Sequence, residues 1–160
     1  MQRLLVGVVA LVFVSLASVS AAWAHCEVPC GIYADQLRFE RMLEDQTTVA
    51  KAMGQIEALA ESDDALSRNQ LARWVTTKES HATNVQQVVA QYFLTQRIKP
   101  AADDAGRKKY VGQLVAAHAV MRAAMKCKQT VDPEDAAALR RAVLDLYRAY
   151  EGKEPTFHKH

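Results

Sequence analysis

Apolar side chains recur at every third or fourth position along most of the chain, which is the spacing of one face of an α-helix. Four such stretches, separated by short polar segments, predict helices over about residues 35–61, 66–96, 108–128 and 133–151. The apolar stripes are, in chain order, Phe39, Met42, Leu43, Val49, Met53, Ile56 and Ala60; Leu71, Trp74, Val75, Ala82, Val85, Val88, Val89, Tyr92 and Phe93; Tyr110, Leu114, Ala117, Met121, Ala124 and Met125; Leu139, Val143, Leu146 and Tyr150. Four amphipathic helices joined by short loops predict an all-α protein, an antiparallel up-down four-helix bundle.

Polar and helix-breaking residues mark the ends of these helices. Asp35 is a candidate N-cap for the first helix, and Ser62-Asp63-Asp64 interrupts the pattern after it. The stretch from Lys99 to Gly106 is expected to be a loop. Asp132-Pro133 predicts a helix start, because Asp caps a helix and Pro suits its first position. Residues 152–160 are expected to form a frayed tail.

The beginning of the chain has a different pattern from the rest. Met1-Gln2-Arg3 is a short positive start, residues 4–22 are apolar and uncharged, and Ala22-Trp23-Ala24 is a signal-peptidase site. The apolar run could just span a bilayer, but the Ala-x-Ala end and the polar chain after it favour cleavage. We therefore expect residues 1–24 to be a leader that is removed during export, leaving no stable membrane association.

Composition narrows the possible functions. The 160 residues carry a formal net charge of +2, which gives no reason to expect a nucleic-acid or membrane-surface partner. Three cysteines are too few for a disulfide framework in a chain of this length. No pattern suggests a Ser/His/Asp triad, a phosphate-binding loop or a catalytic pair of carboxylates.

Cleavage after Ala24 would make His25 the N-terminus, and this changes the chemistry of the segment that follows. The α-amine of His25 and the backbone nitrogen of Cys26 could close a five-membered chelate, and Cys26 and Cys30 could add two thiolates, with Pro29 turning the chain back. The His25 ring could serve as a fifth, axial ligand. Nitrogen and anionic donors in a tetragonal arrangement favour nickel or copper over zinc.

Other interpretations of these residues stay open on chemistry alone. Cys26 and Cys30 could form a small-loop disulfide in an oxidising compartment, in a purely structural bundle. The protein could also be an exported nickel- or copper-binding bundle without turnover. Elsewhere, Cys127 is expected to be a free thiol at a helix end, and His81 and His118 to be surface or core residues rather than ligands.

The segment from His25 to Tyr33 resembles a known family. Its residues, His-Cys-Glu-Val-Pro-Cys-Gly-Ile-Tyr, match the nickel hook of nickel-containing superoxide dismutases in full. The resemblance continues through Gln36 to Glu40, Arg73 to Glu79 and Gln91-Tyr92-Phe93. It implies an enzyme that converts superoxide to dioxygen and hydrogen peroxide by a Ni(III)/Ni(II) cycle, with one nickel ion per subunit.

The resemblance also implies roles for individual residues. Nickel would be held by the amine and ring of His25, the amide and thiolate of Cys26 and the thiolate of Cys30, with the ring bound only in the oxidised state. Tyr33 would lie over the open face of the metal and order the incoming anion. Surrounding roles are implied for three further residues: Glu40 and Arg73 would orient the His25 ring, and Tyr92 would bond near Tyr33.

The helix pattern, the leader and the resemblance together predict the domain organisation and the location. The chain would divide into a leader (1–24), a nickel hook (25–34), a four-helix bundle (35–151) and a tail (152–160), and would assemble as a homohexamer. Some members of the family carry a short pro-segment that a dedicated peptidase removes in the cytoplasm. The leader here reads as a secretion signal, so we expect a periplasmic or extracellular protein, with the cytoplasm as the alternative.

Overall fold

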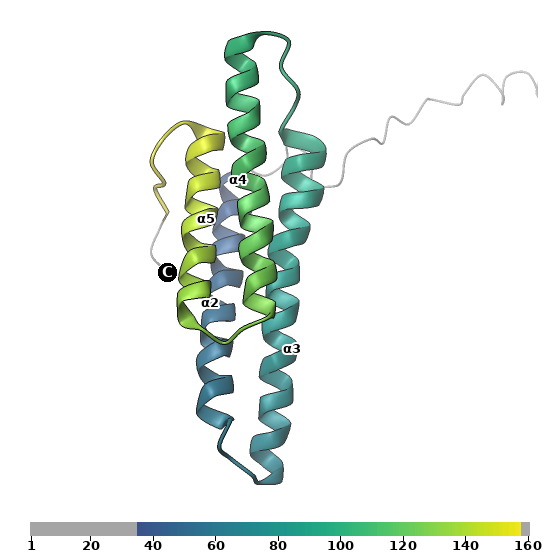
Figure 1. Cartoon of the computed structure of the whole chain (residues 1–160), viewed down its shortest axis with the longest axis vertical. Helices are drawn as coiled ribbons and strands as arrows, with labels where there is room; N and C mark the ends of the chain where they lie inside the picture. The colour runs from purple at the N-terminus through teal and green to yellow at the C-terminus, as the bar shows by residue number, and fades with distance from the viewer. Residues whose placement is uncertain (1–34, 158–160) are drawn as a thin grey trace, which may run out of the picture.

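The structure, a computed structural model, describes residues 35–157 of the chain. Its elements are α2 (Asp35–Leu59), α3 (Ala65–Gln87), the π-helical segment η1 (Val88–Arg97), α4 (Asp104–Lys128) and α5 (Pro133–Glu151). Successive helices run in opposite directions, and η1 continues α3 (Figure 1). The predicted all-α four-helix bundle is confirmed.

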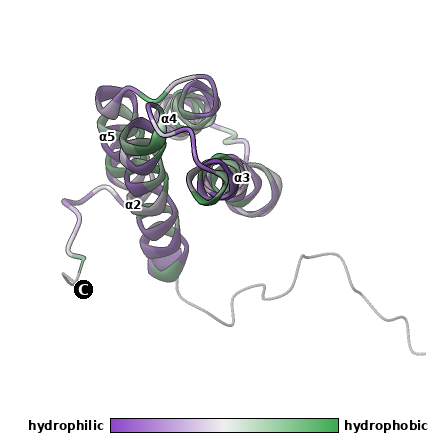
Figure 2. Cartoon of the chain, turned by 90° about the horizontal axis from the view of Figure 1, so that it is seen from below, coloured by the Kyte–Doolittle hydropathy of each residue, from purple (hydrophilic) through white to green (hydrophobic). Residues whose placement is uncertain are grey.

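Each helix packs against two neighbours. Helix α2 lies beside α3 and α5, and α4 lies beside the same two helices. The end-on view shows this four-cornered arrangement, with α5 between α4 and α2 (Figure 2). Within residues 35–157, no helix combines the length and the apolarity needed to cross a membrane.

Aspartate side chains cap three of the helices. Asp64 accepts hydrogen bonds from the backbone N–H groups of Leu66 and Ser67, both at 3.0 Å, and Asp132 accepts one from Glu134 at 2.9 Å. Asp103 accepts one from the N–H of Gly106 at 2.7 Å, so α4 begins at Asp104. The loop that we expected to reach Gly106 therefore ends earlier, at Asp103. The Asp103 side chain pairs with a backbone N–H in the first turn of α4 that has no partner within the helix.

The helix expected over residues 66–96 is not one continuous α-helix. From Val88 the turns widen, and the N–H of Ile98 donates to the carbonyl of Phe93 at 2.8 Å, five residues back. The wider turn places the adjacent side chains of Tyr92 and Phe93 both inside the bundle, 5% and 0% exposed. π-helical segments are rare and are often found at functional sites.

The core follows the predicted stripes in α2 and α5 more closely than in α4. In α4 the buried residues are Gln113, Ala117, Val120, Ala124 and Cys127. The stripe predicted there shares only Ala117 and Ala124 with this set; its larger members line the edge of the core or, like Met125, face solvent. Small residues let α4 approach its neighbours, so they take the central position.

The far end of the α2–α3 pair is less buried than the apolar pattern predicts. Ile56 is only partly buried, Ala60 is exposed, and Leu66 is 67% exposed. Figure 1 shows the reason, because α2 and α3 extend past the loop that joins α4 to α5. The apolar side chains at that end have no third helix to pack against.

The tail is attached to the bundle as far as Phe157, contrary to the frayed tail that we expected. The ring of Phe157 packs edge-on against Tyr147, with centroids 5.0 Å apart. The carbonyl of Thr156 accepts a hydrogen bond from Gln36 at 3.3 Å. After Gly152 turns the chain in the left-handed conformation (φ 73°), an aromatic anchor thus holds the tail beside α5 and α2 (Figure 1).

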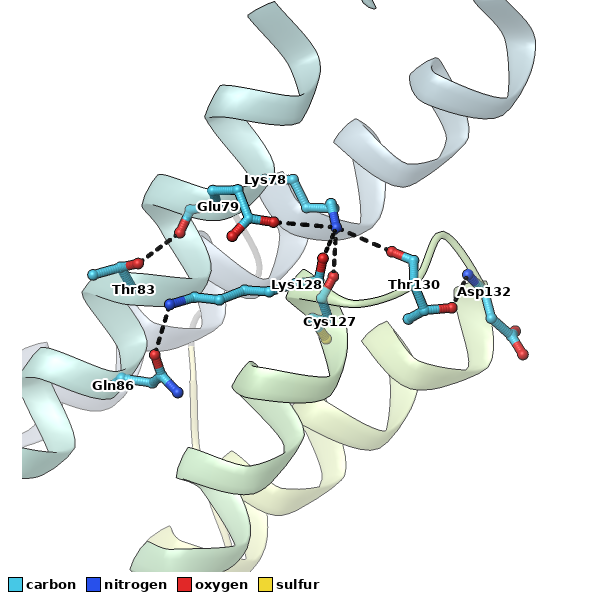
Figure 3. Close-up of polar contacts among 8 residues, drawn as sticks. All are labelled: Lys78, Glu79, Thr83, Gln86, Cys127, Lys128, Thr130 and Asp132. Carbon is cyan, nitrogen blue, oxygen red and sulfur yellow. Dashed lines mark hydrogen bonds and ion pairs between the residues drawn. The ribbon is translucent and has the colours of Figure 1, made fainter. Parts of the chain in front are cut away.

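Lys78 is a buried cation that sequence analysis did not identify. It is 4% exposed, and its Nζ donates to the carbonyls of Cys127, Lys128 and Thr130 at 2.9, 2.6 and 3.1 Å (Figure 3). Glu79 lies 3.4 Å from the same nitrogen. A positive charge at the C-terminal end of α4 pairs with carbonyls that have no partner within the helix.

We expect Lys78→Met to destabilise the bundle by about 2–3 kcal/mol, because it leaves buried carbonyls without their donor. The measurement is urea unfolding of the metal-free protein. Lys126→Met is the matched control, since Lys126 is exposed on the same last turn of α4, and it should change stability by less than about 0.5 kcal/mol. Equal effects of the two substitutions would contradict the capping role of Lys78.

Candidate metal centre and its surroundings

The expected metal ligands His25, Cys26 and Cys30, and the expected substrate-ordering residue Tyr33, lie outside the described residues. Their roles stay predictions. Within residues 35–157, no three His, Cys, Asp or Glu side chains gather closely enough to hold a metal ion. The bundle as described thus offers no second candidate for the metal centre.

Asp35, the first residue of α2, joins three parts of the bundle. Its Oδ1 accepts a hydrogen bond from the hydroxyl of Tyr92, and its Oδ2 accepts from Arg97 and from the hydroxyl of Tyr150, each at 2.6 Å. Arg97 Nε also donates to the Tyr150 oxygen at 3.2 Å. The N-cap role predicted for Asp35 is wrong, because its carboxylate faces η1 and α5 instead of the amides of its own helix.

These hydrogen bonds set the protonation states of Asp35 and of the two tyrosines bonded to it. Burial raises the pKa of the Asp35 carboxyl, but hydrogen bonds from Arg97, Tyr150 and Tyr92 outweigh burial and hold that pKa below its usual value. Burial and the bond to Asp35 raise the pKa of Tyr150 to about 12. The same two causes raise the pKa of Tyr92. At neutral pH the group is therefore a carboxylate, a guanidinium and two neutral phenols.

Tyr92 is the site residue of the bundle whose surroundings are most clearly defined. Its ring packs edge-on against Phe93, with centroids 5.3 Å apart. The guanidinium carbons of Arg38 and Arg97 lie 4.8 and 5.9 Å from the centre of the ring. The phenol thus has a carboxylate at its hydroxyl and positive charge at its face, which fixes its orientation. Its predicted bond near Tyr33 lies outside the described residues.

Glu40 lies one turn beyond Gln36 on α2. It is partly buried and accepts a hydrogen bond from Gln36 Nε2 at 3.0 Å. The Oε1 of Gln36 accepts in turn from the hydroxyl of Tyr147 at 3.2 Å. Gln36 thus has both ends of its amide engaged, so it restrains the Glu40 carboxylate near the start of α2.

The structure does not bring Arg73 to Glu40 within one chain. Arg73 is exposed on α3, beside Trp74, whose ring lies 5.9 Å from the Nζ of Lys51. Lys51 is eleven residues beyond Glu40 on α2, which corresponds to about 16 Å of helix. A joint action of Glu40 and Arg73 on one His25 ring stays a prediction, and it would need Arg73 to come from a neighbouring subunit.

Sequence analysis missed a buried carboxylate on α2. Asp45 Oδ1 lies 2.6 Å from His81 Nδ1 and 3.4 Å from Asn84 Nδ2, and the Asp45 side chain is 9% exposed. The available signal was an acidic residue among the apolar positions of a helix. His81 is thus paired within the bundle.

Cys127 is a buried free cysteine, as expected. Burial, with the nearby charge of Asp135, raises the pKa of its thiol to about 11. Its sulfur lies 3.4 Å from the Asp135 carbonyl. A buried thiol that stays protonated is a poor metal ligand and a poor nucleophile, so Cys127 has a structural role.

Comparison with known proteins identifies the family. Residues 20–154 match the family model of nickel-containing superoxide dismutase. Neither a curated protein nor a solved structure matches the chain. The matched range covers both the segment from His25 to Tyr33 and the four helices of the bundle. The chain therefore belongs to the nickel-containing superoxide dismutases.

Proposed function

We propose that this dismutase acts through a Ni(III)/Ni(II) couple at an N-terminus created by cleavage after Ala24. Two superoxide anions and two protons would yield one dioxygen and one hydrogen peroxide. The family match over the hook and the bundle together is the observation that carries this proposal. Nickel, when bound, supplies the one-electron couple, which is what a dismutation between two oxygen species requires.

The donor set in the first six residues of the processed chain fits nickel. His25 offers an amine and a ring nitrogen, Cys26 an amide nitrogen and a thiolate, and Cys30 a second thiolate. Two nitrogens and two thiolates suit a tetragonal nickel site. Anionic sulfur and amidate donors favour the higher oxidation state, so this set would bring the couple within biological range.

Residues of the chain have distinct tasks in this proposal. When nickel is bound, the His25 ring would supply a further nitrogen donor that favours the oxidised state, and Glu40 would orient that ring. Tyr33 limits access and orders the incoming anion, and Tyr92 holds its place beside it. The fixed orientation of Tyr92 by Asp35 and Arg97 supports this assignment, because an ordering residue needs rigid neighbours.

We further propose export to the periplasm or the cell exterior, and assembly as a homohexamer. The apolar, uncharged residues 4–22 and the Ala22-Trp23-Ala24 site support export. The separation of Arg73 from Glu40 within one chain supports a site completed by a neighbouring subunit. Cell fractionation tests the first proposal, and sedimentation of the processed, nickel-loaded protein tests the second.

The unprocessed precursor should have no dismutase activity. Its His25 nitrogen is part of a peptide bond, so it is an amide and cannot serve as an amine donor. N-terminal sequencing of active protein should begin at His25. Activity at the level of the processed protein in a chain that keeps one extra residue, Ala24, would rule out the amine as a ligand.

Metal analysis together with a superoxide assay separates a dismutase from a metal-binding bundle without turnover. A dismutase should contain one nickel per subunit and turn over superoxide in proportion to that content. Bound nickel without turnover would identify a carrier. No bound metal after growth with nickel would favour a structural bundle with a Cys26–Cys30 disulfide.

A further inference from the structure

We propose that Asp35, held by Arg97, Tyr92 and Tyr150, positions the metal-binding segment on the bundle. These four residues are called the Asp35 cluster. Asp35 acts here as a positioning residue, through the chain that precedes it, and does not touch metal or substrate. This inference rests on the proposed function of the segment from His25 to Tyr33.

Covalent geometry ties the cluster to the proposed site. Asp35 follows Tyr33 by two residues and Cys30 by five. A chain spans at most about 3.6 Å per residue, so the chain allows at most about 7 Å between the Cα atoms of Tyr33 and Asp35, and at most about 18 Å between those of Cys30 and Asp35. A shift or rotation at the start of α2 is therefore transmitted to the proposed ligands over a short distance.

The hydrogen bonds fix both the position and the rotation of the Asp35 carboxylate. Each oxygen has its own donors: Tyr92 on Oδ1, and Arg97 and Tyr150 on Oδ2. The donors come from η1 and from α5, so the first residue of α2 is attached to two other elements. Charge-assisted bonds from different directions are directional as well as strong. The Asp35 side chain is only 13% exposed, which limits competition from water.

Aromatic rings support the cluster from within the bundle. The ring of Phe39 lies 4.7 Å from that of Phe93 and 6.0 Å from that of Tyr150, measured between centroids. Tyr150 also packs edge-on against Phe93 at 5.3 Å. The Tyr150 hydroxyl thus reaches Asp35 from a packed ring with few alternative positions.

Stability alone gives a weak reason for this arrangement. A buried or half-buried ion pair often adds little net stability compared with apolar packing, whereas it can specify one geometry. The first turn of a helix is also where chains commonly fray. Asp35, the first residue of α2, has hydrogen-bond donors on both carboxylate oxygens. These bonds suppress fraying at the point where the metal-binding segment joins the bundle.

The experiment compares nickel-loaded, processed protein with the Asp35→Asn variant. The amide cannot accept the same bonds on both of its ends, so the start of α2 should become less well fixed. We expect nickel content near one per subunit, turnover per nickel lower by about tenfold, and a broadened spin-resonance signal of Ni(III). Tyr150→Phe removes one donor only and should give a smaller loss with less broadening.

Asp45→Asn is the matched control. Asp45 is a buried carboxylate on the same helix, bonded to His81 and Asn84 and remote from the start of α2. It should lower the melting temperature while leaving turnover per nickel and the line shape unchanged. Wild-type turnover and line shape in Asp35→Asn would overturn the inference, as would an equal loss in Asp45→Asn. Wild-type protein that binds nickel without dismutase activity would instead overturn the proposed function.

Discussion

Cys26→Ser and Cys30→Ser should each abolish nickel retention and superoxide turnover. A serine hydroxyl stays protonated at neutral pH and is a poor donor to nickel, so each substitution removes one of the anionic ligands that favour Ni(III). Removing a group outside the ligand set typically lowers metal affinity or activity by about 10–100-fold. Removing either thiolate should lower turnover by more than this. Nickel per subunit, measured after dialysis, and the dismutation rate give the two readouts.

Cys127→Ser is the control for these substitutions. Cys127 is fully buried, 0% exposed, at the end of α4, so its replacement should lower stability but leave nickel content and turnover per folded protein unchanged. Loss of nickel in Cys127→Ser together with its retention in Cys30→Ser would show that the ligand assignment is wrong. Retention in all three variants would favour a nickel site without thiolates.

The fold could be predicted because its main signals are local. Asp132-Pro133 marks the start of α5 correctly, since capping and the fixed backbone of proline act within one turn. The wide turns of η1 were missed, because a π-helix differs from an α-helix only in which carbonyl each N–H reaches. The buried face of α4 was also missed, since two apolar stripes share Ala117 and Ala124, and only the neighbouring helices select between them.

The candidate site likewise has a local part that the sequence predicts and a long-range part that it does not. His25, Cys26 and Cys30 occur within six residues, so a short motif suffices to predict them as ligands. The Asp35 cluster joins residues 57 and 115 positions apart, and no spacing rule in one sequence connects them. The role implied for Arg73 stays a prediction, because His25 lies outside the described residues and the bundle places Arg73 far from Glu40 along the α2–α3 pair.

His25→Gln should keep nickel but lose most of the turnover. The variant retains the α-amine, the Cys26 amide and both thiolates, so these four donors should still hold Ni(II). It loses the ring that would favour Ni(III) as a fifth donor. Dismutation visits both oxidation states in every cycle, so the rate should fall by orders of magnitude. This loss is larger than the decrease of about 10–100-fold expected for a group that only orients a ligand.

Three measurements on the same sample test this expectation: nickel per subunit, the rhombic spin-resonance signal of Ni(III), and the dismutation rate. Glu40→Ala should show a milder form of the same defect, because it leaves the ring present but less well oriented. Arg73→Ala should do so only if subunits assemble, since Arg73 is distant from Glu40 within one chain. A His25→Gln protein with full nickel and wild-type turnover would show that the His25 ring has no part in the reaction, and the other four donors would then have to support both oxidation states.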